Sequence, residues 1–212
     1  MSSSRRSIPL HLVSDKAYPE ADDAALARAL IAGDSWAHTA TWNRFASTVF
    51  NMASHTLGNE DEAKNVTQEV FYRLFTRAKT LRKPESLRSF VISFAIRILK
   101  WQLRRRRANA WLSLRQPQDL PEVQFRGFDP EAREALRRFY GLLDQLATRE
   151  RLVFALRHLE SMEMQEIAAV TRLSLSTVRR THERAALKMS RWIETDEAMT
   201  GFIEKERNRH GI

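Results

Sequence analysis

The chain has 212 residues, no cysteine and a formal net charge of +9. The absence of cysteine excludes a disulfide framework, a thiol nucleophile and a cysteine-ligated metal site, and it fits a reducing cytosol. The positive charge favours a polyanionic partner, nucleic acid first, although ribosomal and membrane-surface proteins share it. Six glycines and six prolines are few for this length, and apolar residues recur at helical spacing in nearly every segment. The sequence therefore predicts an all-α fold with two helical domains.

The N-terminal residues 1–21 contain two arginines and a short apolar stretch that Pro9 and His11 interrupt. This stretch is too short for a signal peptide or a membrane anchor. We therefore expect a disordered N-terminal arm on a cytoplasmic protein that has no membrane partner.

Residues 22–112 form the first predicted helical domain. Either Asp22 or Asp23 can cap its first helix, which ends at Gly33, and a second helix ends at Gly58. After a third apolar face comes the clearest amphipathic run of the chain. It starts at Leu87 and repeats at three- and four-residue steps without a miss.

The polar side of this last helix is strongly basic, with six cations and no acid from Arg97 to Arg107. That density suits phosphate contacts with counterion release, whereas the plainer alternative is a solvated helix end. Trp101 lies among these cations. It either stacks on an exposed base or packs against a neighbouring helix.

Composition changes at residues 113–131, which we interpret as an interdomain linker. Its part from Gln116 to Glu131 has three prolines, one glycine and four acids against the single basic residue Arg126. A negative segment in a basic protein favours a domain boundary over a surface loop.

Residues 132–193 form the second predicted domain, and the stretch from Met164 to Arg180 has the pattern of a helix-turn-helix. A turn at Arg172 joins a short helix to a recognition helix that Ser174 or Ser176 caps. Its buried face includes Val178, either Thr181 or His182, Ala185, Met189 and Trp192. The side chains expected to face the major groove or its phosphates are Ser176, Thr177, Arg179, Arg180, Arg184 and Lys188. The alternative is an ordinary helical hairpin with a solvated charged face.

The order of these parts resembles the sigma-70 family, specifically its two-domain extracytoplasmic-function group. The segment NVTQEVF at residues 65–71 is similar to the family's "DLVQEVF" helix, and residues 87–107 resemble its −10 helix. Residues 143–151 resemble the "LP..R" segment, and the motifs from Glu166 to Ala185 resemble the "EIA…GTV…RA" domain that reads the −35 element. The resemblance spans roughly residues 22–193.

This resemblance implies a non-enzymatic initiation factor without a cofactor. Its partners are promoter DNA and core RNA polymerase, through the β′ clamp helices and the β flap, and an anti-sigma factor is a further expected partner. The residues expected on polymerase are Glu62, Asn65, Gln68 and Glu69. Those expected at the −10 element are Arg82, Lys83, Arg88, Arg97, Lys100, Trp101 and Arg104.

Several positions depart from the family pattern. Arg97 and Trp101 replace an Asn and an Asp of the −10 helix, so we expect an unusual −10 preference, and Ala147 and Arg172 replace the usual Pro and Gly. In the polymerase-docking helix, Lys64 and Asn65 replace acids, which predicts weak docking on a basic surface.

Phosphorylation of Thr67 by a Ser/Thr kinase adds about 1.5–2 negative charges there, as in a kinase-controlled subgroup that this chain resembles. The alternative is that Glu60, Asp61, Glu62 and Glu69 suffice and Thr67 is a bystander.

The main rival interpretation is a stand-alone helix-turn-helix regulator that binds duplex DNA without polymerase. An RNA-binding or enzymatic protein is the other rival. The six histidines show no metal-ligand spacing, and we find neither a Gly-rich phosphate loop nor a nucleophile–base pair. Residues 194–212 are expected to form a loosely held C-terminal extension, with one amphipathic helix through Met199, Phe202 and Ile203.

Overall fold

The computed structural model describes residues 22–112 and 129–210, and helices are the regular structure in both ranges, as the all-α prediction required. The predicted N-terminal arm and linker residues 113–128 lie outside the described residues. The first half comprises α1 (Asp23–Ala32), α2 (Ser35–Leu57), α3 (Glu60–Thr76), the 3-10 turns η1 (Ala78–Thr80) and η2 (Pro84–Ser86), and α4 (Leu87–Leu112). The second half comprises α5 (Pro130–Gln145), α6 (Thr148–His158), α7 (Met164–Thr171), α8 (Leu175–Thr195) and α9 (Glu197–His210).

Local capping signals set the helix boundaries. Asp22, rather than Asp23, caps α1, because its Oδ1 accepts a hydrogen bond from the Ala25 amide at 2.6 Å. Asn59 caps α3 in the same way by accepting from the Glu62 amide at 2.8 Å. At the other ends, Gly33 and Gly58 adopt the left-handed conformation after α1 and α2. Asp129 caps α5 and Pro130 opens it, so the last predicted linker residues belong to this helix.

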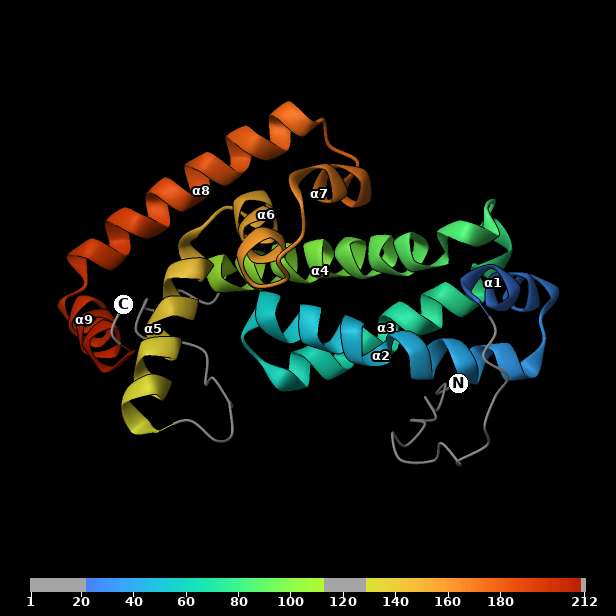
Figure 1. The fold of residues 1–212 in the computed structure, drawn as a ribbon, viewed down its shortest axis with the longest axis horizontal. Helices are drawn as coiled ribbons and strands as arrows, with labels where there is room; N and C mark the ends of the chain where they lie inside the picture. The colour runs from blue at the N-terminus through green and yellow to red at the C-terminus, as the bar shows by residue number, and fades with distance from the viewer. Residues whose placement is uncertain (1–21, 113–128, 211–212) are drawn as a thin grey trace.

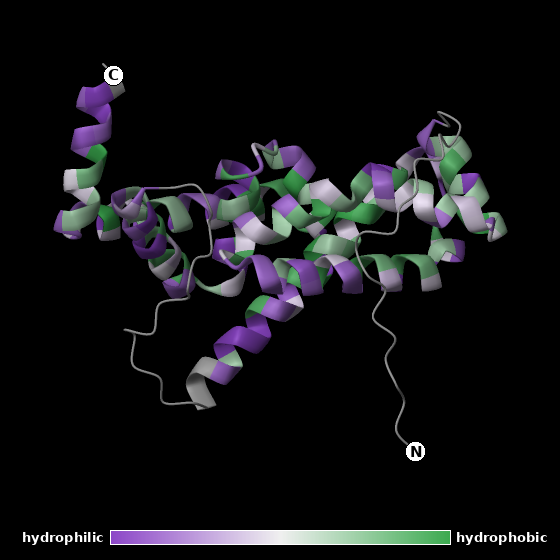
Figure 2. Cartoon of the chain, turned by 90° about the horizontal axis from the view of Figure 1, so that it is seen from below, coloured by the Kyte–Doolittle hydropathy of each residue, from purple (hydrophilic) through white to green (hydrophobic). Residues whose placement is uncertain are grey.

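The first half is a helical bundle around the long helix α4 (Figure 1). Helices α2 and α3 pack against each other and against one side of α4, while α1 crosses the end of the bundle near η1 and η2. Its core contains Val49, Phe71, Leu74, Leu87 and Leu99, all at most 2% exposed. Figure 2 shows green apolar residues concentrated where these helices pack.

The second half is built on the helix-turn-helix. Helices α6 and α7 both pack on α8, and α5 crosses the C-terminal part of α8. Leu143, Leu146, Phe154 and Met189 form a small core between α5, α6 and α8. The predicted C-terminal helix exists as α9, which is mostly hydrophilic (Figure 2) but buries Met199 and packs on α5 and α8.

The two halves pack directly on each other. Helices α6 and α7 lie between α4 and α8 in Figure 1, with α6 also touching α2. One continuous apolar cluster joins Val49 and Leu99 of the first half to Leu152, Leu156 and Ile167 of the second. Within the described ranges, no helix is both long and apolar enough to cross a bilayer.

Candidate nucleic-acid and protein interfaces

The turn of the helix-turn-helix has a defined geometry. Arg172 ends α7 in the left-handed conformation with φ of 58°, and Ser174, rather than Ser176, caps α8 by accepting from the Thr177 amide at 3.2 Å. On the buried face of α8, Val178 is 0% and Thr181 2% exposed, whereas His182 is only half-buried. The structure therefore selects Thr181 of the two residues that the sequence left open.

The left-handed conformation at Arg172 costs stability because its Cβ crowds the following carbonyl. We expect Arg172→Gly to raise the free energy of unfolding by about 1 kcal/mol, which is about 2–4 °C in Tm for a chain of this size. Thermal unfolding followed by circular dichroism measures this. Arg172→Ala, which keeps a Cβ, is the control and is expected to leave Tm unchanged within about 1 °C. An equal gain from both variants would contradict the backbone explanation.

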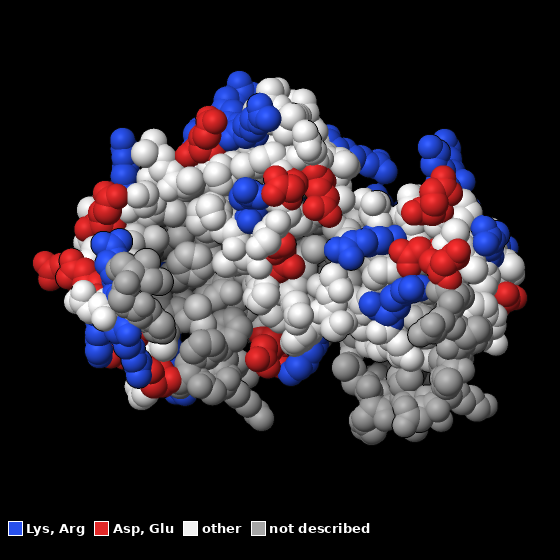
Figure 3. Space-filling model, viewed as in Figure 1, with Lys and Arg blue, Asp and Glu red and all other residues white. Residues whose placement is uncertain are grey.

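The outer face of α8 is exposed and cationic. Ser176, Arg179, Arg180 and Arg184 are all exposed, and Thr177 is half-buried with its hydroxyl 2.7 Å from that of Ser174. Figure 3 shows Lys and Arg side chains gathered at the top of the molecule, over the N-terminal part of α8. A helix with short polar residues at its start and long cations beside them has the form that a major groove accepts.

Lys188 differs from the other cations predicted on this face. Its Nζ lies 2.8 Å and 3.1 Å from the two carboxylate oxygens of Glu150, a residue that is 7% exposed. Burial alone raises the pKa of Glu150, but hydrogen bonds from Lys188 and from the Ala147 amide outweigh it and hold the pKa below its usual value. Lys188 thus neutralises a buried carboxylate between α8 and α6.

Two histidines connect the recognition helix to α6. The rings of His158 and His182 stack with centroids 5.0 Å apart, and their Nε2 atoms are 2.9 Å apart. Partial burial, followed by the charge of His182, lowers the pKa of His158. Partial burial and the charge of Arg157 lower the pKa of His182.

Because both folded-state pKa values lie below the unfolded value near 6.5, the native state binds fewer protons than the unfolded state as pH falls. The pair therefore contributes stability above that unfolded value, and this contribution is lost as pH falls through the lowered folded values. We expect urea unfolding at pH 7.5 and pH 5.5 to show a smaller pH dependence in the double variant His158→Gln/His182→Gln than in the wild type. The other histidines are common to both proteins, so an identical pH dependence would contradict the prediction.

The residues predicted for the −10 element fall into two groups on α4 and its approach. Arg82, Lys83 and Arg88 are exposed at the N-terminal end of α4. The other four lie toward its C-terminal end, where Arg97, Trp101 and Arg104 are exposed and Lys100 is half-buried. At 1.5 Å per residue, about 24 Å of helix separates Arg88 from Arg104. The seven predicted residues therefore do not form one compact patch on α4.

Trp101 points away from the core and is 51% exposed, which favours the stacking interpretation over packing. The guanidinium carbon of Arg105 lies 5.5 Å from the Trp101 ring centroid. Arg106 is the member of the arginine run that turns inward. Arg106 donates to Glu62 and to the Leu57 carbonyl at 2.8 Å, so it is committed to protein contacts rather than to phosphate.

The predicted polymerase-docking helix, α3, has a polar exposed face with little unpaired charge. Asn65 and Gln68 are exposed, and Tyr72 extends the same face at 67% exposure. Glu69 pairs with Arg73 within the helix. Asp61 pairs with Lys64 at 2.9 Å. Two acids of this face are thus paired within the helix, and weak docking on a basic surface stays a prediction.

Glu62 is held from α4. It accepts hydrogen bonds from Gln102 at 2.7 Å and from Arg106 at 2.8 Å. Burial raises the pKa of Glu62, but these two hydrogen bonds and the charges of Arg106 and Arg151 outweigh it, so that the pKa lies below its usual value. Glu62 is therefore an ionised internal partner of α4. Of the four predicted docking residues, Asn65, Gln68 and Glu69 remain on the outer face.

Thr67 lies on the inner side of α3. It is 4% exposed, and its hydroxyl donates to the Ala63 carbonyl at 2.8 Å. A kinase cannot reach this hydroxyl in the conformation described here. Phosphorylation at this position therefore stays a prediction, and it requires that the packing of α3 first expose the acceptor hydroxyl.

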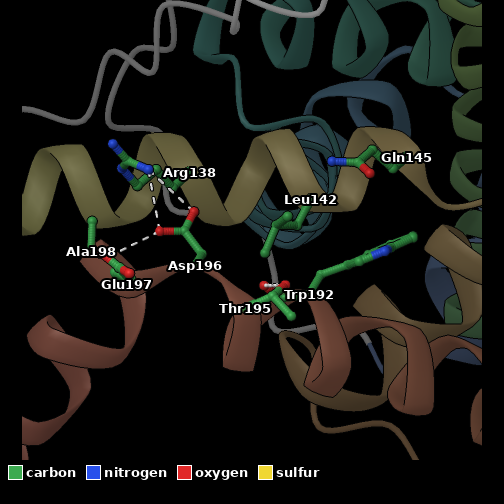
Figure 4. Close-up of a pocket in the computed structure, with 8 residues that line it drawn as sticks. All are labelled: Arg138, Leu142, Gln145, Trp192, Thr195, Asp196, Glu197 and Ala198. Carbon is green, nitrogen blue, oxygen red and sulfur yellow. Dashed lines mark hydrogen bonds and ion pairs between the residues drawn. The ribbon is translucent and has the colours of Figure 1, made fainter.

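An open groove of about 590 Å³ lies between α5 and the junction of α8 and α9 (Figure 4). Arg138 of α5 and Asp196 of the junction form an ion pair at 3.2 Å on its wall, beside Leu142 and Trp192. None of the predicted site residues lines this groove. In the part of the chain that the structure describes, no three His, Asp or Glu side chains are grouped to hold a metal ion.

Sequence reasoning missed the residues that join the halves. The sequence pattern around Arg151 and Tyr140 predicted only ordinary helices. In the structure, both side chains donate hydrogen bonds to backbone carbonyls of α2. One feature of the sequence could have indicated this role. Arg151 ends the LDQLATRER segment, and the family pattern also has an Arg at this position.

Two family models match separate parts of the chain. A family model described as Sigma-70 region 2 matches residues 41–109, which cover most of α2, all of α3 and most of α4. A second, described as Sigma-70, region 4, matches residues 136–189, which contain the helix-turn-helix. Helices α1 and α9 lie outside both matches.

The chain is also similar to individual sigma factors. RNA polymerase sigma factor SigV of Bacillus subtilis (strain 168) is 25% identical over 142 residues, which are 67% of this chain and 81% of SigV. Among solved structures, CnrH in complex with the cytosolic domain of CnrY has a TM-score of 0.59 at 21% identity, covering 82% of this chain and 99% of that chain. The sigma factor RpoE in complex with the anti-sigma factor NepR from Bartonella quintana has a TM-score of 0.52 at 14% identity, covering 74% of this chain and 96% of that chain.

The two family matches, the similar sigma factor and the fold lead to the same assignment. The chain belongs to the sigma-70 family and is an extracytoplasmic-function sigma factor, which directs RNA polymerase in transcription.

Proposed function

We propose that this sigma factor docks on core RNA polymerase through the outer face of α3, contacts the −10 element through the C-terminal part of α4, and binds the −35 duplex through α8. The observation that carries the proposal is the exposed cationic face of α8 in a capped helix-turn-helix, on the same chain as the exposed side chains of Trp101 and Arg104 on α4. Residues 22–112 and 132–193 are the two functional domains under this proposal, and residues 194–212 are an extension.

Run-off transcription with core polymerase on a randomised promoter library tests this directly. We expect transcripts only when the chain is present, and selected promoters with two conserved elements. A stand-alone regulator would bind duplex DNA equally well without polymerase and would not co-purify with it. Co-purification with core polymerase therefore separates the two functions.

A protein of the anti-sigma class is a further proposed partner. Its support is the fold shared with two sigma factors whose structures contain CnrY and the anti-sigma factor NepR. Such a partner is expected to compete with core polymerase, so a pull-down with increasing polymerase should release it. Binding of both at once would contradict this part of the proposal.

Phosphorylation of Thr67 remains a prediction with a structural condition attached. The paired acids of α3 support weak docking, which phosphate would strengthen. The burial of Thr67 opposes it, because α3 must first leave α2 or α4. If α3 moves so that Thr67 becomes exposed, a kinase-treated sample is expected to bind polymerase more tightly than an untreated one. If α3 stays packed, the two samples are expected to bind equally.

The charge and the hydroxyl of position 67 can be tested separately. We expect Thr67→Val to change the free energy of unfolding by less than about 1 kcal/mol, because the hydroxyl bonds only within its own helix. Thr67→Glu is expected to lower it by about 3 kcal/mol or more, since it buries an unpaired charge. Thr76→Glu, at an exposed threonine of the same helix, is the matched control. Urea unfolding and a polymerase pull-down measure both effects. Normal stability with stronger polymerase binding in Thr67→Glu would contradict the burial argument and favour the switch.

A further inference from the structure

The turn of the helix-turn-helix contains an arginine in a backbone conformation that favours glycine. Helix α7 ends at Arg172, whose φ is 58° and whose amide donates to the Ala168 carbonyl. Helices α1 and α2 end in the same left-handed conformation, and there the chain has Gly33 and Gly58. A Cβ in this conformation crowds the following carbonyl, so arginine destabilises the turn relative to glycine. Strained positions of this kind cluster at functional sites, which points to a role for Arg172 outside the fold.

The Arg172 side chain makes no contact that offsets this strain among the described residues. It is exposed, and in residues 22–112 and 129–210 neither a hydrogen bond nor an ion pair joins its guanidinium to another group. Asn and Asp tolerate the left-handed region because their short side chains bind the local backbone, which the Arg172 side chain does not do here. A long cation without such a partner is available to an anion outside the protein.

Arg172 lies beside the N-terminal end of the recognition helix. Ser174, the cap of α8, comes two residues later, and Ser176 and Arg179 are exposed on the first turns of that helix. In Figure 1, the turn between α7 and α8 lies at the outer edge of the molecule. Since consecutive Cα atoms are about 3.8 Å apart, the Cα atoms of Arg172 and Ser176 lie within about 15 Å of each other. The turn thus extends the cationic outer face of α8 past the start of the helix.

The anion that fits this position is a DNA phosphate. When the N-terminal end of a recognition helix enters the major groove, which is about 12 Å wide, the segment just before it lies over the edge of the groove. The sugar-phosphate strand follows that edge and has a phosphate about every 3.4 Å. The planar guanidinium of arginine binds phosphate oxygens through two parallel hydrogen bonds.

We propose that Arg172 contacts a phosphate of the −35 duplex from the turn of the helix-turn-helix, and that this contact offsets the strain of its backbone. The inference rests on the proposed function, because that function places the duplex on α8. It adds a residue of the preceding turn to the contacts predicted on the helix. A phosphate contact carries no sequence information, so it strengthens binding to every duplex that α8 holds.

Three substitutions separate the side chain from the backbone. Arg172→Gly and Arg172→Ala both remove the guanidinium, but only glycine also removes the strain. We expect both variants to weaken binding of a −35 duplex by about fivefold to tenfold at about 0.1 M salt, and to make the slope of log affinity against log salt shallower by about one unit. Arg172→Gly should show this loss although its Tm is higher than that of the wild type. Arg172→Lys keeps a cation and is expected to keep the slope.

Fluorescence anisotropy measures these quantities on two labelled duplexes. One carries the −35 element of the promoters selected by run-off transcription, and the other has the same length with that element scrambled. We expect the Arg172 variants to lose affinity by the same factor on both duplexes. Arg207→Ala is the charge-matched control, because Arg207 is exposed on α9, beyond the opposite end of α8. It is expected to change the affinity by less than about twofold.

The outcomes distinguish this inference from the proposed function. Unchanged affinity and slope in Arg172→Gly and Arg172→Ala, with weaker binding in Arg180→Ala, would overturn the phosphate contact and leave the proposed function in place. A loss confined to the −35 duplex would also overturn it, because the contact would then read sequence. A wild type that binds neither duplex would overturn both.

A second measurement identifies the phosphate. Methylphosphonate groups, which have no negative charge, replace the phosphates at the edge of the −35 element one at a time. We expect one replacement to weaken binding of the wild type about fivefold and that of Arg172→Ala less than about twofold, because the variant has already lost the contact. Arg179→Ala keeps Arg172 and should stay sensitive at that position. Equal sensitivity of the wild type and Arg172→Ala to every replacement would overturn the contact.

Discussion

Arg151→Met is expected to lower the free energy of unfolding by about 3 kcal/mol. Methionine keeps the apolar stem but removes the donors to the Thr56 and Leu57 carbonyls. At 2% exposure, the site admits little water to replace them. Leaving buried acceptors without partners costs about 1–3 kcal/mol each, although Arg106 still serves the Leu57 carbonyl. This loss of unfolding free energy should be among the largest that any single substitution of a polar residue causes in the chain.

Urea unfolding followed by tryptophan fluorescence measures this effect. Arg149→Met is the control, because Arg149 is exposed two residues earlier on the same helix. It is expected to change the free energy of unfolding by less than about 0.5 kcal/mol. A loss below about 1 kcal/mol in Arg151→Met would show that the α2 carbonyls do not depend on this guanidinium.

Alanine at Arg179, Arg180 or Arg184 is expected to weaken binding of a −35 duplex by about tenfold in each case. These side chains are exposed on α8, so their removal should leave the free energy of unfolding within about 0.5 kcal/mol of the wild type. A substitution that removes a phosphate contact should also make the slope of log affinity against log salt shallower by about one unit. Fluorescence anisotropy at several salt concentrations measures both quantities.

Lys188→Ala is the matched control for this series and should show the opposite pattern. It leaves the Glu150 carboxylate, whose side chain is 10% exposed, without its cation. We therefore expect a loss of about 1–3 kcal/mol in unfolding free energy and a small change in DNA affinity. If Lys188→Ala weakened DNA binding as much as Arg180→Ala and left stability unchanged, Lys188 would be a DNA contact after all.

The sequence by itself determined the helices and the apolar face of each. Apolar spacing of three and four residues, together with caps such as Asp22, Asn59 and Ser174, is a local property and needs no knowledge of the rest of the chain. For the same reason, the exposed face of the recognition helix could be predicted from Val178, Ala185 and Met189 on its opposite side. The order of the motifs was enough to suggest the family.

Burial of polar residues could not be predicted in this way. Thr67 flanks the apolar stripe of α3, and its hydroxyl is satisfied by its own helix, so nothing local distinguishes it from an exposed threonine. Lys188 belongs with the other cations of α8 by spacing, and only the position of Glu150 on α6 shows that it is paired. Such assignments depend on which helix covers which face.

The tertiary structure alone decided how the two cationic surfaces are placed relative to each other. The hydrogen bond from Arg151 to the Thr56 carbonyl joins residues 95 positions apart, across a linker with no periodic pattern. Helical periodicity shows which face of a helix is apolar, but not which distant helix covers that face. The sequence also does not show which side chain will bind a free backbone carbonyl at a helix end. The sequence thus predicted two DNA-contacting parts, whereas their closure onto the end of α2 follows from long-range packing and buried charge.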